Sequence, residues 1–303
     1  MNTQHLQYLI EIERMRSISQ AAENLYIGQP NLSRILHEME QDVGFAIFER
    51  TSRGVRPTER GADFLRHARS ILREVDSIDA LGPRHSVPNR LRVCLPRSAT
   101  QFDAAAEYLT TLSDSENFEV NVKECFARQA LEMVANGEAE IGVIRFRSDY
   151  YDYFQEQTSA GNLSFQQLAR FEYQLVLAKD HPLAPEKTVT QEMLFEYTEI
   201  AHGTLPRGRS KSEEQKNRRI YTVDRMAQMQ LLSSIWGAYM WSEPIAKRYL
   251  QTWGLTQKTC AGNRPSYCDA LIFHPQYAMN DLEAGFVRQM IRTAHSSSRI
   301  YEK

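Results

Sequence analysis

Two adjoining segments near the amino terminus constrain the fold of this chain more than any other feature. Ser19–Leu25 carries small and polar residues that suit a short helix, and a turn through Tyr26–Gly28 follows it. Gln29–Leu36 then opens a second helix with polar side chains and continues it with apolar residues at helical spacing. Two short helices joined in this way are typical of a helix-turn-helix, whose second helix enters the major groove of DNA.

The flanking segments extend this motif into a winged helix-turn-helix. A helix is expected over 4–14, ahead of the motif. After the motif, two short extended pieces surround the turn Ser52-Arg53-Gly54 and predict a β-hairpin wing.

A long helix is expected next, over residues 59–81, with Thr58 as its N-cap. Its apolar residues step by four and three, which is a heptad seam: Phe64, Ala68, Ile71, Val75 and Ile78. The seam favours pairing with a second copy of the helix, because no neighbouring segment supplies an obvious cover. The alternative is a single helix lying on its own domain.

Beyond a hinge at Gly82–Pro88 the pattern changes to alternating strands and helices. Strands are expected over 91–95, 118–122 and 140–144, with helices over 101–112 and 126–136 between them. A second set follows, with strands over 173–178, 199–202 and 238–241 and a helix over 224–236. A strand over 270–273 and a helix over 280–294 return to the first half. This order predicts parallel sheets with helices on their faces.

Charge distribution supports nucleic-acid binding more than net charge does. The net charge of the 303 residues is −2, yet residues 50–73 hold seven arginines against two acidic residues. No window approaches a membrane span, the first residues lack the pattern of a secretory signal, and four cysteines do not suggest a disulfide framework. We therefore expect a protein of the reducing cytoplasm.

Four motifs resemble the LysR-type transcriptional regulators: Ser19-x-Ala21-Ala22-x-x-Leu25, Gln29-Pro30-x-Leu32-Ser33-Arg34, Phe48-Glu49-Arg50 and Thr58-x-x-Gly61. With the order of winged helix, long helix and α/β domain, the resemblance covers the whole chain. It implies an α/β protein overall, with a two-lobed effector domain similar to type 2 periplasmic binding proteins. It also implies a bacterial regulator that binds promoter DNA and a small-molecule effector, pairs through its linker helices, works as a tetramer and contacts RNA polymerase.

On this basis we expect a winged helix-turn-helix over residues 1–58, a linker helix and hinge over 59–88 and an effector-binding domain over 89–303. Within that domain, lobe I takes in 89–162 and 268–303, and lobe II takes in 163–267.

The residues expected to contact DNA lie at the start of the second helix of the motif and on the wing: Gln29, Pro30, Asn31, Ser33, Arg34, Thr51 and Arg53. Amide, hydroxyl and guanidinium groups suit base edges and phosphates, and Arg53 would reach the minor groove or the backbone. Pro30 serves the helix start instead. Two positions depart from the family pattern: Gly28 replaces a capping hydroxyl, and Asn31 replaces a small residue and could read adenine.

The effector is expected outside the carboxyl ends of the strands, near helix N-termini, where an anion is favoured. The residues expected there are Ser98, Ala99, Thr100, Arg145, Phe146, His202, Gly203 and Thr204. The loop over 96–100 supplies the first of these and also contains Arg97.

Two alternatives were weighed against this interpretation. An enzyme built on the α/β half is disfavoured, because the sequence has no phosphate-binding glycine loop, nucleophile elbow or metal-ligand spacing, and no cofactor is expected. A redox sensor on the same scaffold would use Cys260 and Cys268, but buried inert thiols are the favoured interpretation of that pair.

Overall fold

The structure, a computed structural model, describes residues 2–52, 54–79, 89–112, 117–203, 218–263, 265–275 and 279–301. The expected hinge, Arg53 and Thr204 lie outside these ranges. Internal contacts divide the chain into two compact units. One comprises Met1–Arg92, Ser115–Asn121 and Glu132–Glu140, and the other comprises Val93–Asp114, Val122–Leu131 and Ile141–Lys303.

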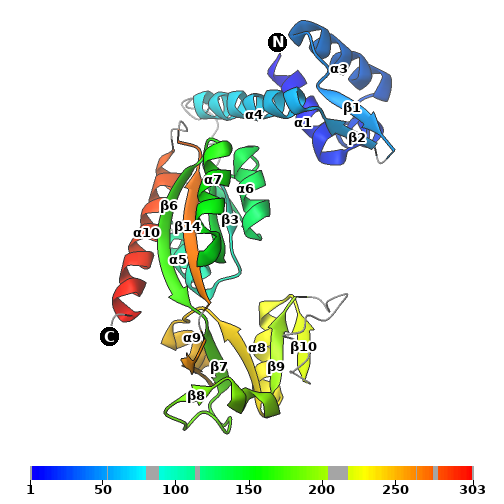
Figure 1. Ribbon diagram of the computed structural model, residues 1–303. Helices are drawn as coiled ribbons and strands as arrows, with labels where there is room; N and C mark the ends of the chain where they lie inside the picture. The colour runs from blue at the N-terminus through cyan, green and yellow to red at the C-terminus, as the bar shows by residue number, and fades with distance from the viewer. Residues whose placement is uncertain are drawn as a thin grey trace. The chain divides into compact units, whose positions relative to one another are not determined.

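The amino-terminal region, residues 2–79, has the winged helix-turn-helix that the sequence predicts (Figure 1). Its elements are α1 (Thr3–Met15), α2 (Ile18–Asn24), α3 (Gln29–Val43), β1 (Phe48–Thr51), β2 (Gly54–Pro57) and α4 (Glu59–Asp79). Strands β1 and β2 pair antiparallel, from Phe48 opposite Pro57 to Thr51 opposite Gly54. Because Val55 N–H donates to Arg16 O at 2.9 Å, the wing is fixed to the end of α1.

One apolar core holds these elements together. Leu6, Leu9 and Ile12 of α1 are buried against Leu32, Ile35 and Met39 of α3. Burial of such side chains is the main stabilising contribution, about 2 kcal/mol each. Because the apolar face of α3 packs into this core, its opposite, polar face is exposed. A helix arranged in this way can enter a groove.

Thr58 and Gly61 explain how α4 can start so close to the wing. The Thr58 side chain accepts a hydrogen bond from Gly61 N–H at 2.9 Å and donates to Ala46 O at 2.7 Å. A Cβ on Gly61 would lie 1.8 Å from Ile47 O, so only glycine fits there. Leu65 and Ala68 of α4 then enter the core as it passes over α1.

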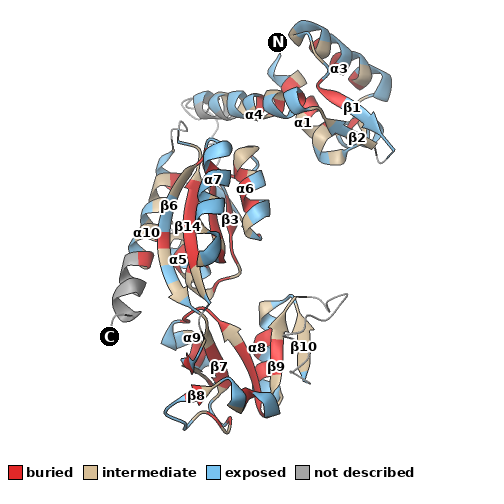
Figure 2. Cartoon of the chain, in the orientation of Figure 1, coloured by how far each residue is buried: buried red, intermediate tan, exposed pale blue. Residues whose placement is uncertain are grey.

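The first lobe is built on a five-stranded sheet in the order β4-β3-β5-β14-β6. Its strands are β3 (Asn89–Leu95), β4 (Phe118–Glu124), β5 (Ile141–Arg147), β6 (Ser164–Glu172) and β14 (Ser266–Phe273). Its helices are α5 (Ala99–Thr110), α6 (Ala127–Ala135), the 3-10 turn η1 (Ser148–Tyr150), α7 (Tyr151–Ala160) and α10 (Asp281–Tyr301). Figure 2 shows burial concentrated along β14, the strand between β5 and β6.

The second lobe is built on a sheet in the order β10-β9-β11-β7-β12. Its strands are β7 (Gln174–Ala178), β9 (Thr198–His202), β10 (Arg219–Thr222), β11 (Ala238–Ser242) and β12 (Leu255–Lys258). Its helices are η2 (Glu192–Glu196), α8 (Arg225–Ser234) and α9 (Lys247–Thr252). A small sheet joins β8 (Val189–Thr190) and β13 (Cys260–Ala261). Both large sheets contain buried apolar residues. Examples are Ala270 on β14 of the first lobe and Val176 and Ile200 on β7 and β9 of the second.

The observed sheets correct the expectation of purely parallel strands. Strands β3 and β5 are parallel, as are β9 and β10, but β14 runs antiparallel to both β5 and β6. Strand β7 likewise runs antiparallel to β11 and β12. The antiparallel strands β7 and β14 are the first long strands after the chain passes from one lobe to the other, and each enters its sheet from the opposite end to its neighbours.

The first crossing falls later along the chain than the boundary expected at 163. Strand β6 pairs along its length with β14 in the first lobe, and β7 begins the second lobe after Tyr173. The second lobe is thus an insertion between β6 and β14. No helix in the described part of the chain combines the length and apolar content needed to cross a membrane.

Candidate functional site

The exposed edge of α3 carries the polar side chains that the sequence singles out. Gln29 Nε2 donates to Ser33 Oγ at 2.8 Å, one turn later. Arg34 donates to Asn31 Oδ1 at 2.9 Å and to Glu38 Oε1 at 2.5 Å, and its side chain is 63% exposed. Exposed pairs of this kind contribute little free energy, so these donors and acceptors can exchange their partners for those of a ligand.

The start of α3 shows the weak cap expected from Gly28. Gly28 has extended dihedral angles but makes no side-chain cap hydrogen bond, and Pro30 occupies the first turn. Tyr26, in the turn before it, has a φ of 55° and is 96% exposed. The sequence indicates Tyr26 only as part of the turn, and the structure shows its side chain on the surface three residues before α3 begins.

The arginines that follow α3 differ in how far they are available to a ligand. Arg56 pairs with Glu49, Arg66 pairs with Asp63, and the buried Arg69 pairs with Glu13. The wing residue Thr51 is exposed and its hydroxyl donates to Gly54 O at 3.0 Å, which closes the hairpin. Because exposed pairs can exchange their partners, Arg56 remains available to a ligand, whereas the buried Arg69 does not.

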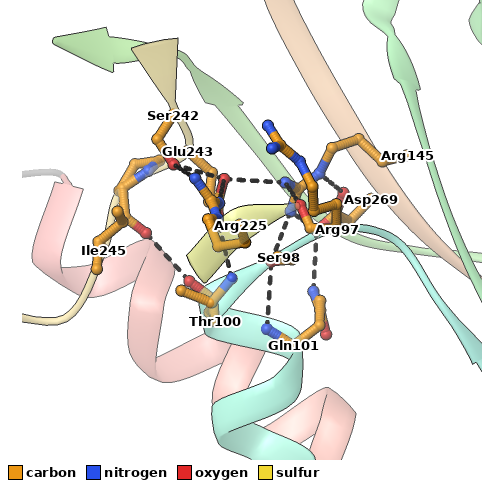
Figure 3. A network of polar contacts seen from close by, with 12 residues as sticks. Arg97, Ser98, Thr100, Gln101, Arg145, Arg225, Ser242, Glu243, Ile245 and Asp269 are labelled. Carbon is orange, nitrogen blue, oxygen red and sulfur yellow. Dashed lines mark hydrogen bonds and ion pairs between the residues drawn. The ribbon is translucent and has the colours of Figure 1, made fainter. Parts of the chain in front are cut away.

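A buried polar network joins the ends of several strands in the second compact unit (Figure 3). Arg145 on β5 makes a two-pronged ion pair with Asp269 on β14, at 2.7 Å for both nitrogen–oxygen distances. Arg145 also donates to Ser98 Oγ at 2.9 Å, and Gln101 donates to Asp269 at 2.9 Å. Burial lowers the pKa of Arg145, but Asp269 and Glu243 more than offset it, so the net pKa is raised and the guanidinium stays charged.

Glu243, directly after β11 of the second lobe, meets this network from the other side. Its carboxylate lies 2.9 Å from Arg225 Nη2 through both oxygens and 3.3 Å from Arg145 Nη1. It also accepts hydrogen bonds from Ser242 Oγ at 2.8 Å and from Ala99 N–H at 2.7 Å. Burial alone would raise the pKa of Glu243, but the two arginines and these hydrogen bonds bring it down to about 2.

Arg97 differs from Arg145 and Arg225 because it forms no ion pair with the described residues, although Glu243 and Glu124 act on it from further away. Its guanidinium donates to Gln228 Oε1, and no carboxylate of the described residues lies within ion-pair distance of it. Burial and the neighbouring charge of Arg225 lower the pKa of Arg97 to about 10. Burial, Arg97 and Arg225 also lower the pKa of His202, whose ring lies 6.0 Å from that of Phe126. An anion placed here would relieve an electrostatic imbalance.

The structure brings most of the expected effector residues together, but it uses several of them for internal contacts. Ser98 caps α5 through Gln101 N–H at 3.3 Å, and Thr100 donates to Pro244 O at 3.0 Å. Gly203 follows β9 with a φ of 125°, a conformation that favours glycine. Thr204 lies outside the described residues.

Phe146 lies elsewhere, which corrects its expected place beside the effector. Because successive side chains of a strand point to opposite faces, Phe146 faces away from Arg145. Its ring stacks on Phe154 at 4.5 Å and packs near Phe165. It belongs to an aromatic cluster of the first lobe.

The sequence did not indicate six members of the network: Gln101, Arg225, Gln228, Ser242, Glu243 and Asp269. Arg97 lay in the loop that was singled out but was not chosen. Asp224 caps α8 by accepting from Ala227 N–H at 2.7 Å, and that cap could have drawn attention to Arg225 beside it. Glu243 had no such local signal.

The cysteines fit the interpretation as buried thiols. All four are buried and none of them forms a disulfide, and Cys268 is 1% exposed. Burial, with the charge of Asp269, raises the pKa of Cys268 to about 12. A thiol that stays protonated is a poor nucleophile toward peroxide.

Comparison with known proteins shows which family the amino-terminal region resembles. Residues 3–62 match the model of the bacterial regulatory helix-turn-helix protein, lysR family. These residues include the whole of α1–α3 and the wing. The amino-terminal region thus matches the helix-turn-helix of LysR-family regulators.

Similarity to a curated relative extends beyond the helix-turn-helix. The HTH-type transcriptional regulator PcaQ of Agrobacterium fabrum is 28% identical over 197 residues, which are 64% of this chain and 60% of PcaQ. The chain thus aligns with somewhat over half the length of that curated relative.

Two solved structures of the family share the fold over nearly the full length. LysG of Corynebacterium glutamicum, with bound effector Arg, has a TM-score of 0.64 at 12% identity and covers 98% of this chain and 99% of its own. CbnR, complexed with its target DNA, has a TM-score of 0.52 at 20% identity and covers 97% of this chain and 100% of its own. At identities this low, both establish the fold alone, including the two-lobed α/β domain.

Proposed function

We propose that the protein is a sequence-specific DNA-binding transcriptional regulator whose activity is switched by a small-molecule effector between its two lobes. The observation that carries the proposal is the exposed polar edge of α3, inside the region that matches the LysR helix-turn-helix model. The relatives named above are a transcriptional regulator, an effector complex and a DNA complex, and all three support it.

In this proposal α3 is the recognition helix. Gln29, Asn31, Ser33 and Arg34 contact base edges and nearby phosphates, and Pro30 presets the first turn. Thr51 and Arg53 of the wing contact the DNA backbone or the minor groove. Asn31 can make two hydrogen bonds to adenine and would set a preference at one operator position.

The proposed assembly is a dimer through the linker helix α4, with a tetramer as the working form. The support is the outer half of the heptad seam, because Ile71 is 37% exposed and Ile78 is 64% exposed in a single chain. Apolar residues at heptad spacing on an uncovered helix face favour packing against a second copy. Cytoplasmic action and contact with RNA polymerase follow from the same family interpretation.

The effector is proposed to be a small anion. Arg97 supplies the charge that recognises it, with His202 and Gly203 on the facing loop, and Thr204 beyond it. Ser98, Ala99, Thr100 and Arg145 form the adjoining wall. An effector can change the arrangement of the DNA-binding regions only through different affinities for the two arrangements.

DNA binding is tested by fluorescence anisotropy of the protein with its own promoter fragments over a range of salt. Arg34→Ala should weaken specific binding about 5- to 150-fold, which corresponds to about 1–3 kcal/mol for a base contact. Arg90→Ala is the matched control, because Arg90 is similarly exposed (59%) and pairs with Glu119 at 2.8 Å outside the helix-turn-helix. The proposal fails if the unmodified protein shows no salt-sensitive binding to these fragments.

Effector binding is tested separately by a thermal-shift screen of small mono- and dicarboxylates. A compound that raises the unfolding temperature of the unmodified protein should lose its effect with Arg97→Met and keep it with Arg90→Met. Equal shifts in both variants would exclude Arg97 from the site.

A further inference from the structure

Glu243 is a buried acidic residue that the proposed function does not explain. It is an acidic side chain, 2% exposed, and it follows the last residue of β11 in the second lobe. Its partners Arg145 and Ala99 belong to the first lobe, whereas Arg225 and Ser242 belong to the second. A single carboxylate therefore connects the two lobes.

The place that this carboxylate fills has the properties of an anion site. Ala99 is the first residue of α5, and its N–H is one of the donors that no residue of the helix can satisfy. A negative charge is favoured at that end of the helix. Two guanidinium groups and one hydroxyl surround the same oxygens, as Figure 3 shows. A free carboxylate ligand would seek the same donors.

We infer that Glu243 is a resident anion: it occupies the position between the lobes where a ligand carboxylate would otherwise bind, and it holds the lobes together without an effector. The inference rests on the proposed function only in placing the effector between the lobes. With this position filled, the negative charge of an effector is left to Arg97. The two lobes are then in contact at Glu243 without a ligand. The effector acts on a domain in which this contact is already formed.

Other contacts on the same side of the domain agree with this arrangement. Thr100 of α5 donates to Pro244 O at 3.0 Å, next to Glu243. Asp103, one turn further along α5, pairs with Arg248 of α9 and accepts from Tyr249 Oη at 2.5 Å. The N-terminal half of α5 is thus bonded to the second lobe at three successive points.

The test is rescue of Glu243→Ala by formate, the smallest carboxylate, with neither DNA nor effector present. The truncation leaves a space lined by Arg145, Arg225 and Ala99 N–H. We expect a lowered unfolding temperature, of which about 100 mM sodium formate restores roughly half, relative to sodium chloride at equal ionic strength. Glu243→Gln should lose stability without rescue, because its side chain still fills the space.

Glu199→Ala is the matched control for the loss of a paired carboxylate. Glu199 pairs with Arg219 at 2.8 Å within the second lobe and caps no helix. Formate should not rescue this variant. Equal rescue of both alanine variants, or none for Glu243→Ala, would overturn the inference.

Hydrogen exchange provides a second readout that does not depend on a folded variant. In the ligand-free, unmodified protein the Ala99 amide should exchange at least about tenfold more slowly than an exposed helix-start amide, because Glu243 accepts its hydrogen bond. Rapid exchange at Ala99 would overturn the inference even if Glu243→Ala fails to fold. Neither the formate rescue nor the hydrogen exchange depends on DNA. A negative result in either would therefore overturn this inference without affecting the DNA-binding proposal, which is tested by anisotropy.

Discussion

Replacing Gly61 by alanine tests whether α4 really starts against the wing. Alanine in a helix is favoured over glycine by about 1 kcal/mol, so propensity alone predicts a more stable protein. The structure predicts the opposite, because the new Cβ would lie 1.8 Å from Ile47 O, whereas ordinary contact begins at 3.4 Å. The carbonyl must retreat by the difference, 1.6 Å.

That retreat disturbs a bonded and buried carbonyl. Ile47 O accepts a hydrogen bond from Thr58 N–H at 3.0 Å, and the Ile47 side chain is fully buried. Overpacking costs about 1–3 kcal/mol and the weakened hydrogen bond about 1 kcal/mol. After the gain from helix propensity, Gly61→Ala should lower the free energy of unfolding of the amino-terminal region by about 2 kcal/mol.

Hydrogen exchange followed by mass spectrometry measures this locally in the full chain. A loss of about 2 kcal/mol should raise the exchange rate of peptides from α1 and α3 about 30-fold. Gly28→Ser is the control in the same region, because a Cβ on Gly28 would make only an ordinary contact, 3.8 Å from Pro30 Cδ, and an N-cap hydroxyl should slow exchange slightly. Unchanged or slower exchange in Gly61→Ala would refute the close approach of α4 to Ile47.

Three further predictions address the linker, the buried carboxylate and the thiols. Ile78→Glu should weaken dimerisation at least about tenfold by sedimentation, because a charge would enter the seam, whereas Glu74→Gln should not. The pKa of Glu243 lies below its ordinary 4.5, so its stabilising contribution, about 3 kcal/mol, is present above that pH and lost as the pH falls toward 2. The unfolding temperature of the unmodified protein should therefore fall more steeply than that of Glu243→Gln between pH 5 and 3; parallel curves would contradict this. Cys260→Ser and Cys268→Ser should leave the effect of peroxide on DNA binding as it is in the unmodified protein. If either substitution removed an effect of peroxide, the redox alternative would be restored.

The amino-terminal region was predictable from the sequence because its signals are local. Leu32, Ile35 and Met39 repeat at helical spacing, and Thr58 precedes a long run without proline. Each helix is therefore marked within a few residues of its own chain. Gly61 could be recognised as part of a motif, but its reason, the nearby Ile47 carbonyl, is visible only in three dimensions.

The polar network was predictable only in part, because its partners are distant in the chain. The loop over 96–100 and Arg145 follow from the rule on strand ends, and both lie in the network. Glu243 meets Ala99 across 144 residues of sequence, so a single acidic residue after a strand carried no sign of its role. Phe146 follows Arg145 on the same strand, so its side chain points to the other face, where it packs on Phe154.

The late position of β14 has a consequence for how the chain is made. The strand that completes the first sheet leaves the ribosome only after the whole second lobe has been synthesised, since β14 comes after β13 in sequence and lies between β5 and β6. Until then β5 and β6 present unpaired backbone edges, while the amino-terminal helices can already fold. Slow translation or premature termination within residues 174–265 should therefore yield nascent chains that hold a folded DNA-binding region but aggregate or recruit chaperones through an unfinished sheet.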